Sequence, residues 1–295
     1  MEIKNGMLPR VLICAPVSKR HKEVFIDWIG HLNRMSYPVF DVCVVDNTPD
    51  DEDFYNSIKD LTVKNKKIIS WRSPWKPDDE HSLRMIARVR EGIRQYFLKS
   101  DYDYLFWIDT DIFIPTNGIE KLLSYNKDNV GFYVHIFPEG KQVPCLLKSG
   151  DIVMGKGMEF FSFDEINAYK EFVGDLRANR LSEEQKKLVP FIIKDTKNPQ
   201  LINIYGVNMG CLLVNRRVVE EVPIRTHPTF LMGEDIWYFA EANDKHFEFW
   251  CDTDVRAEHR NQTWADVDSL NKDNFKFAIA YGPENATEVE VIKNG

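Results

Sequence analysis

The chain has 295 residues, of which 43% are hydrophobic and 28% charged, the composition of a globular protein rather than a disordered or fibrous one. Its 46 acidic and 38 basic residues give a net charge of −8, which disfavours nucleic acid or an anionic membrane as a partner of the whole surface. No segment reaches the roughly 20 apolar residues of a transmembrane helix or has the pattern of a signal peptide, so we expect a cytoplasmic protein.

Five cysteines lie far apart in the chain, without any C-x-x-C pair. This odd, scattered set argues against both a disulfide framework and a zinc cluster. We therefore expect small buried thiols in a reducing compartment. The five are Cys14, Cys43, Cys145, Cys211 and Cys251.

The first half of the chain alternates short apolar runs rich in β-branched residues with longer helical patterns. This β-α-β-α-β order predicts an α/β fold with a mixed, mostly parallel sheet flanked by helices. The continuous apolar runs favour strands that are buried on both faces. We expect strands at 10–16, 39–46, 67–71 and 104–109, with helices at 22–34 and 82–98 and a further segment near 54–61.

The second half contains an insertion at about 137–204, followed by a return to regular structure. Two helix-start signatures, Ser162-x-x-Glu165 and Ser182-x-x-Gln185, predict short helices within the insertion. A long insertion of this kind is often a functional segment that covers a cleft, so we expect a lid. Further helices are expected at 119–125, 216–222 and 233–244, strands at 129–136, 210–215 and 246–251, and a polar tail after 260.

Ligands of an open α/β sheet bind at the carboxyl ends of its strands, which here points to Pro16, Asp46, Trp71 and Asp109. Asp-x-Asp is a weak motif that occurs five times in this sequence, so its context must decide. The five pairs are Asp51/Asp53, Asp101/Asp103, Asp109/Asp111, Asp252/Asp254 and Asp266/Asp268.

Asp109 and Asp111 follow an apolar strand and precede Ile112, so their ionised carboxylates need a cation nearby. Residues i and i+2 of extended chain lie on one side, and together they suit a divalent cation with a diphosphate. The alternative is that they are turn or capping carboxylates. For Asp252 and Asp254, which also follow an apolar run, we favour that alternative.

Three further features have both a chemical and a structural interpretation. Glu234 and Asp235 open a helical pattern, where they can serve as a general base or can simply favour the positive end of the helix dipole. His259 completes a metal site if the chain returns it to Asp111, and is otherwise structural. In the helix at 82–98, Arg84, Arg88, Arg90 and Arg94 are expected mostly on a solvated surface, although one of them can face a diphosphate.

Taken together and in order, these pieces resemble the GT-A glycosyltransferases, especially the inverting family-2-like group. The matching segments are 13–21, 44–48, 87–93, 104–112, 208–218, 233–244 and 252–259. The resemblance implies one domain over 1–295, with a nucleotide-binding half at about 10–115, an acceptor half at about 116–260 that contains the insertion, and a tail at about 261–295.

The resemblance also implies roles for individual residues. Asp235 is then the catalytic base, and Asp109, Asp111 and His259 bind the metal, Mn²⁺ or Mg²⁺. The residues expected to bind substrate are Pro16, Asp46, Arg90, Asp109, Gly210, Glu234 and Trp237. Glu91 stands after Arg90 where this family often has Asn, which leaves Arg88 as the alternative to Arg90, and Glu234 is the alternative to Asp235.

The expected activity is a metal-dependent, hexosyltransferase-like transfer of a sugar from a nucleoside-diphosphate sugar to an acceptor hydroxyl, with inversion. A divalent cation neutralises the charge of the leaving diphosphate. The acceptor stays open among a glycan, a lipid-linked glycan, a protein and a modified DNA base. The rival interpretations are a catalytically silent sugar- or nucleotide-binding module and a sugar-nucleotide pyrophosphorylase, whose glycine-rich phosphate loop is missing after Pro16.

Overall fold

The computed structural model describes residues 7–49, 52–74, 76, 82–136, 143–144, 146–150, 158–207, 209–227 and 233–260. Cys145, Asp266/Asp268 and the expected tail at 261–295 lie outside these ranges. None of the described helices is long and apolar enough to cross a membrane.

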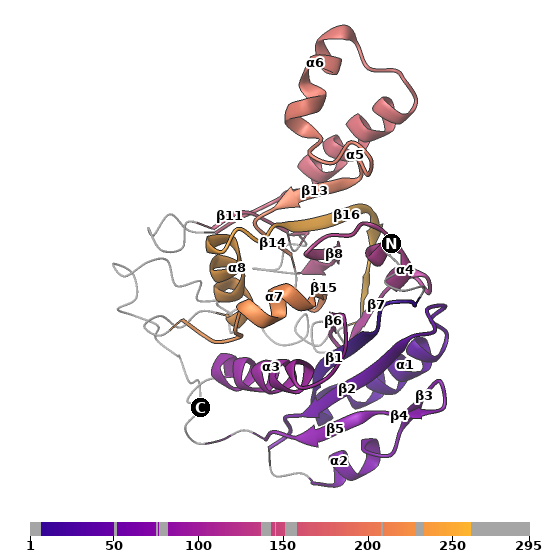
Figure 1. The fold of residues 1–295 in the computed structure, drawn as a ribbon, viewed down its shortest axis with the longest axis vertical. Helices are drawn as coiled ribbons and strands as arrows, with labels where there is room; N and C mark the ends of the chain where they lie inside the picture. The colour runs from indigo at the N-terminus through magenta and orange to yellow at the C-terminus, as the bar shows by residue number, and fades with distance from the viewer. Residues whose placement is uncertain are drawn as a thin grey trace, which may run out of the picture.

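An eight-stranded mixed sheet forms the centre of the molecule, in the order β13-β16-β8-β15-β6-β1-β2-β5 (Figure 1). β1 pairs in parallel with β2 and β6, β2 with β5, and β8 with β16, whereas β15 and β13 run antiparallel to their neighbours. The expected α/β sheet is therefore confirmed. Its strands are β1 Val11–Val17, β2 Phe40–Asp46, β5 Ile69–Arg72, β6 Tyr104–Ile108, β8 Asn129–Tyr133, β13 Leu201–Ile204, β15 Cys211–Asn215 and β16 Phe249–Arg256.

Helices cover both faces of the sheet. Successive strand residues therefore point into two different cores. In β1, Val11, Ile13 and Ala15 face one core, and Leu12 and Cys14 face the other. The first core includes α1 Lys22–Asn33, α2 Glu52–Ile58 and α4 Gly118–Ser124; the second includes α3 Ser82–Leu98, α7 Arg216–Glu221 and α8 Glu234–Asp244. The four described cysteines are buried, as expected.

Short elements join these layers. A 3-10 turn, η1 Lys19–His21, precedes α1. The small pairings are β3 Thr62–Val63 with β4 Lys66–Lys67, β7 Ile112–Phe113 with β17 Glu258–His259, β9 His135–Ile136 with β10 Val143–Pro144, and β11 Leu146–Gly150 with β12 Met158–Phe160 and β14 Gly206–Val207.

The insertion contains the two helices that its sequence predicts, α5 Phe163–Arg177 and α6 Glu183–Ile192, and each begins with a capping box. Both helices stand beyond the edge strand β13, away from α3 and β6 (Figure 1). The Tyr169 hydroxyl of α5 lies 2.9 Å from the carbonyl oxygen of Leu201, which ties the helix to that edge. The lid stays a prediction, because residues 137–142, 145 and 151–157 of the insertion lie outside the described ranges.

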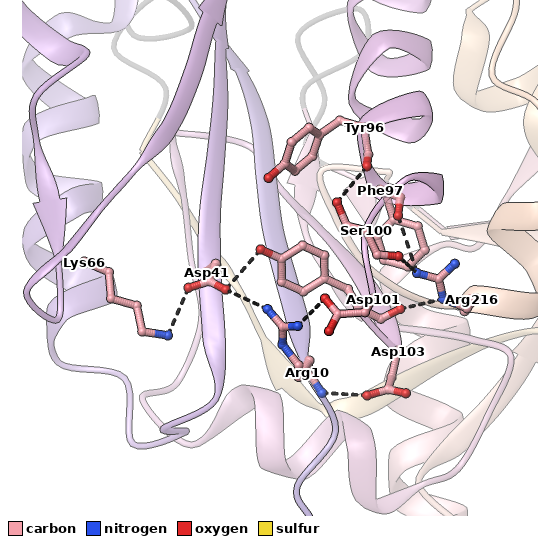
Figure 2. A network of polar contacts seen from close by, with 10 residues as sticks. Arg10, Asp41, Lys66, Tyr96, Phe97, Ser100, Asp101, Asp103 and Arg216 are labelled. Carbon is pink, nitrogen blue, oxygen red and sulfur yellow. Dashed lines mark hydrogen bonds and ion pairs between the residues drawn. The ribbon is translucent and has the colours of Figure 1, made fainter.

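A polar network joins the amino ends of the central strands (Figure 2). Asp41 accepts hydrogen bonds from Lys66 Nζ at 2.9 Å and from the Tyr102 hydroxyl at 3.0 Å, and it also faces Arg10. Arg10 pairs with Asp101, and its backbone N–H donates to Asp103 Oδ2 at 2.8 Å. Although burial raises the pKa of Asp41, these partners lower it below its usual value. The network therefore favours the ionised carboxylate.

Two sequence expectations need correction at the level of the fold. Pro16 lies inside β1, where it is in register with Val45, and does not follow the strand. Asp252 and Asp254 lie inside β16 rather than after a strand, because β16 continues to Arg256. These two carboxylates therefore do not emerge at a strand end.

Candidate active site

Asp109 directly follows β6, as the sequence predicts, and its turn is fixed by the backbone. Its N–H donates to the carbonyl oxygen of Gly210 at 2.9 Å, and its own carbonyl accepts from the N–H of Ile112 at 2.9 Å. The turn leads straight into β7. Gly210 therefore lies beside Asp109, at the start of the strand that pairs with β6.

The pairing of β7 with β17 returns the end of the described chain to Asp111. His259 is in register with Ile112, and His259 Nε2 lies 3.3 Å from Asp111 Oδ2. The backbone N–H of Arg260 donates to the carbonyl oxygen of Asp111 at 2.7 Å. The chain thus brings His259 back to Asp111, which was the condition for His259 to be a candidate metal ligand.

Arg90 reaches this turn from α3 and is 5% exposed. Its Nη2 donates to Asp109 Oδ1 at 2.9 Å, its Nε lies 3.3 Å from Glu234 Oε1, and its guanidinium lies over the ring of Trp107, 5.2 Å from the centroid. Nε and Nη1 are both buried without a hydrogen-bond partner in the described part of the chain, although Nε is within ion-pair distance of Glu234. Arg90 thus joins two carboxylates and has donors left for a ligand.

Arg84 of α3 is exposed, as expected, whereas Arg88 and Arg94 differ from the expectation of a solvated surface. Arg94 is buried and donates to the carbonyl oxygens of Val219 and Glu220. Arg88 is partly buried and donates to Ser73 and to the carbonyl oxygen of Pro74. The expectation failed because helical spacing shows which residues share a face, but not which element covers that face.

Glu234 and Asp235 form the first turn of α8, after Gly233 at the N-cap. Asp235 Oδ1 accepts the N–H of Ile236 at 2.8 Å. A Cβ at position 233 would lie 2.5 Å from that oxygen, so glycine lets the carboxylate fold over the helix start. Glu234 is buried, whereas Asp235 is partly exposed.

Burial and neighbouring charges shift the pKa values of the carboxyl groups at this end of the sheet. Burial raises the pKa of Glu234 to about 7; Arg90 opposes the increase and Asp235 adds to it. Burial likewise raises the pKa of Asp235 and of Asp109, and Asp111 raises that of Asp109 further. Clusters of carboxyl groups with shifted pKa values around one arginine are typical of functional sites.

Asp46 ends β2 and is completely buried. Its Oδ1 accepts the N–H of Thr48 at 2.9 Å, and its Oδ2 lies 3.4 Å from Arg72 Nε. Arg72 also donates to Glu52 at 3.1 Å. Because β1 pairs in parallel with both β2 and β6, Asp46 lies at the same end of the sheet as Asp109.

Three residues of this region escaped the sequence analysis. Arg72 follows the expected strand at 67–71 and could have been found at its carboxyl end. Trp107 lies within the apolar run that predicts β6, so it gave no signal beyond burial. His227 packs edge-on against Trp237, with ring centroids 4.4 Å apart, and no motif marks it.

The second Asp-x-Asp pair considered, Asp252/Asp254, is structural. Asp252 is fully buried, 2.7 Å from Lys121 Nζ and 2.7 Å from the hydroxyl of Tyr125. Asp254 pairs with Arg177 of α5 at 3.1 Å. The pair therefore joins β16 to its neighbours and leaves no charge for a ligand.

Within the ranges that the structure describes, no three His, Cys, Asp or Glu side chains already form a metal cluster. Asp111 and His259 are already close, and Asp109 lies two residues before Asp111. Two carboxylates with a neutral imidazole are ligands that suit Mn²⁺ or Mg²⁺. The donor set therefore fits a divalent cation.

No family model matches the chain, and no curated protein matches it. Among solved structures, the chain is similar to a crystal structure of GalNAc-T7 with UDP, GalNAc and Mn²⁺, at a TM-score of 0.55 and 11% sequence identity. The match covers 85% of this chain and 44% of that one. The chain thus has the GT-A fold that its sequence motifs predict.

Proposed function

We propose that the protein is a metal-dependent glycosyltransferase that moves a sugar from a nucleoside-diphosphate sugar to an acceptor hydroxyl. One observation supports this most: Arg90 and the carboxylates of Asp109, Glu234 and Asp235 gather at the carboxyl ends of a GT-A sheet. The fold neighbour was crystallised with UDP, GalNAc and Mn²⁺, which is consistent with a nucleotide-sugar donor here.

On the donor side, Asp46 and Arg72 are proposed to bind the nucleoside, with Pro16 on the neighbouring strand β1, one residue before its end. Asp109, Asp111 and His259 would hold the metal, which when bound neutralises the charge of the diphosphate. Arg90 Nη1 is a buried donor without a partner in the described chain, so it is suited to a diphosphate or sugar oxygen. Gly210, whose carbonyl oxygen accepts the N–H of Asp109, is proposed to line the same site.

On the acceptor side, Asp235 is proposed as the general base and Glu234 as the residue that positions Arg90. Asp235 is the more exposed of the two carboxylates, and a base must reach the acceptor proton. Its raised pKa brings it closer to neutral pH, as base catalysis favours. Trp237, whose ring is braced by His227, would stack against a sugar.

The test is a screen of uridine, guanosine and thymidine diphosphate sugars for hydrolysis with and without Mn²⁺. We expect one donor to be hydrolysed in a metal-dependent way, and Asp111→Ala to abolish this. Asp53→Ala is the matched control, because Asp53 belongs to another Asp-x-Asp pair and lies exposed on α2. Tight donor binding without turnover would instead favour the silent binding module, and pyrophosphate-dependent release of a nucleoside triphosphate would favour the pyrophosphorylase.

A further inference from the structure

The most exposed apolar cluster in the described chain lies on α6, outside the candidate active site. Five large hydrophobic side chains are exposed in the described chain, and the last three of them belong to α6: Met7, Ile26, Leu188, Phe191 and Ile192. The last three follow i, i+3, i+4 spacing, so they form one stripe, which we call the α6 stripe. Phe191 is 75% exposed.

Nothing in the described chain covers this stripe. α6 has no buried residue, and it contacts the small core around Tyr169 and Val173 through Val189 and, just beyond its end, Ile193. A helix of 10 residues is marginal by itself in water. An apolar stripe on such a helix is typical of an interface.

The charged residues of α6 lie in its first half. Glu183 and Glu184 are in the first turn and are followed by Lys186 and Lys187, whereas Lys194 comes after the end of the helix. Lys186 is paired with Glu183. By helical spacing Glu184 shares the face of Leu188 and Lys187 the face of Phe191. Glu184, Lys187 and Lys194 are exposed and have no ion pair within the described ranges.

We propose that the α6 stripe binds the α6 stripe of a second copy of this chain, with the two helices antiparallel across a two-fold axis. In that arrangement the first turn of each helix faces the end of the other helix, so that Glu184 lies near Lys194 of the other copy. The apolar side chains pack at the centre. A self-complementary patch of this kind is what a two-fold dimer requires.

Glu184 and the net charge of the chain disfavour an anionic lipid surface as the occupant. Glu184 lies on the face that would meet the lipid, and the whole chain has a net charge of −8. The helix is only about 15 Å long, and small interfaces are usually transient. We therefore expect a weak, concentration-dependent dimer. The stripe stands beyond β13, so the dimer does not depend on the proposed function (Figure 1).

Sedimentation velocity over about a hundredfold range of concentration tests the dimer directly. The full chain should shift from monomer to dimer, and Phe191→Ser should remain monomeric. Ile26→Ser removes an exposed apolar side chain from α1 and should dimerise like the parent chain. A monomeric parent chain at every concentration, or equal dimerisation of Phe191→Ser, would overturn the proposal.

Charge reversal tests the antiparallel arrangement. Glu184→Lys and Lys194→Glu should each weaken the dimer by about tenfold, because two attractive pairs become repulsive. Mixed in equal amounts, the two variants should dimerise again, since each Lys then faces a Glu. Failure of the mixture to recover, or pelleting of the parent chain with phosphatidylglycerol vesicles as a monomer, would contradict self-association through α6.

Discussion

The two ends of the central sheet carry the same residue types in opposite electrostatic states. At the amino ends, Arg10 and Lys66 meet Asp41, and the pKa of that carboxylate is lowered. At the carboxyl ends, one arginine, Arg90, meets several carboxylates, and the pKa of Glu234 is raised to about 7. At the amino end each carboxylate of the network has a cation or a backbone N–H as its partner, whereas the carboxyl end has an excess of negative charge that a bound cation would compensate.

The strand β6 makes this comparison especially clear, because an Asp-x-Asp pair lies at each of its ends. Asp101 and Asp103 precede it and are bound by Arg10. Asp109 and Asp111 follow it, and Asp109 faces a buried arginine that is shared with Glu234. The motif is therefore the same at both ends, and the surroundings alone separate the structural pair from the candidate active-site pair.

The largest effect is expected from Asp235→Asn, which keeps the shape of the carboxyl end and removes its proposed base. Turnover should fall by about 10²–10⁴-fold with little change in donor affinity, because general-base catalysis has this magnitude. Glu234→Gln is the control within the same turn, and it should affect donor binding more than the chemical step.

Proton NMR of the first-formed product accompanies this test. The anomeric coupling should show inversion of the donor configuration, since a single displacement requires a base on the acceptor side. Retention would reject Asp235 as that base, even if the variant were inactive.

The next largest effect is expected from Arg90→Met. Removing one partner of a buried ionic cluster typically costs about 3–5 kcal/mol of unfolding free energy. Without Arg90, the buried Glu234 and the partly exposed Asp109 lose their cation, so their folded pKa values should rise further above the unfolded ones. The variant should therefore lose less stability at acidic pH, where these carboxyl groups are protonated, than at alkaline pH, where they are ionised.

Urea denaturation of Arg90→Met and the parent chain at pH 5 and pH 8 measures this difference. The gap in unfolding free energy should be wider at pH 8. An equal gap at both pH values would show that groups other than Arg90 compensate the negative charge of these carboxylates.

A smaller destabilisation is expected at the amino end from Asp41→Asn. The substitution should cost about 1–3 kcal/mol, because Lys66 and Tyr102 lose a charged partner. The folded pKa of Asp41 is below its unfolded value, so the stabilisation is complete above the unfolded pKa and is lost as pH falls through the folded pKa.

Thermal unfolding of Asp41→Asn between pH 2 and pH 7 should therefore converge with that of the parent chain at the acidic end. Curves that stay parallel over the whole range would mean that ionisation of Asp41 contributes nothing. Donor binding at neutral pH should be unchanged, because the network lies at the other end of the strands.

Local sequence signals predicted much of this structure. Periodicity located α3 and the central strands, and the spacing of Ser162 with Glu165 and of Ser182 with Gln185 predicted two capping boxes. Each of these signals depends on a few neighbouring residues, so it can be recognised in the sequence without knowledge of tertiary contacts. The position of Asp109 after β6 is of the same kind.

The parts that were wrong or missed depend on contacts between distant segments. Arg94 is buried because α7 supplies carbonyl oxygens, more than a hundred residues later. β16 extends to Arg256 because β8 and β13 pair with it, which moves Asp252 into the sheet. The link between Asp111 and His259 likewise needs the β7–β17 pairing, which the sequence alone left open.

The central claim is that the excess negative charge at the carboxyl end of β6 binds a metal and a nucleoside diphosphate. Calorimetric titration of the tightest-binding nucleoside diphosphate, with and without Mn²⁺, tests it most directly in the parent chain, Asp111→Ala and Asp53→Ala. Mn²⁺ should raise the affinity at least about tenfold in the parent chain and Asp53→Ala, and should give no gain in Asp111→Ala. The same Mn²⁺-dependent gain in Asp111→Ala would contradict the account.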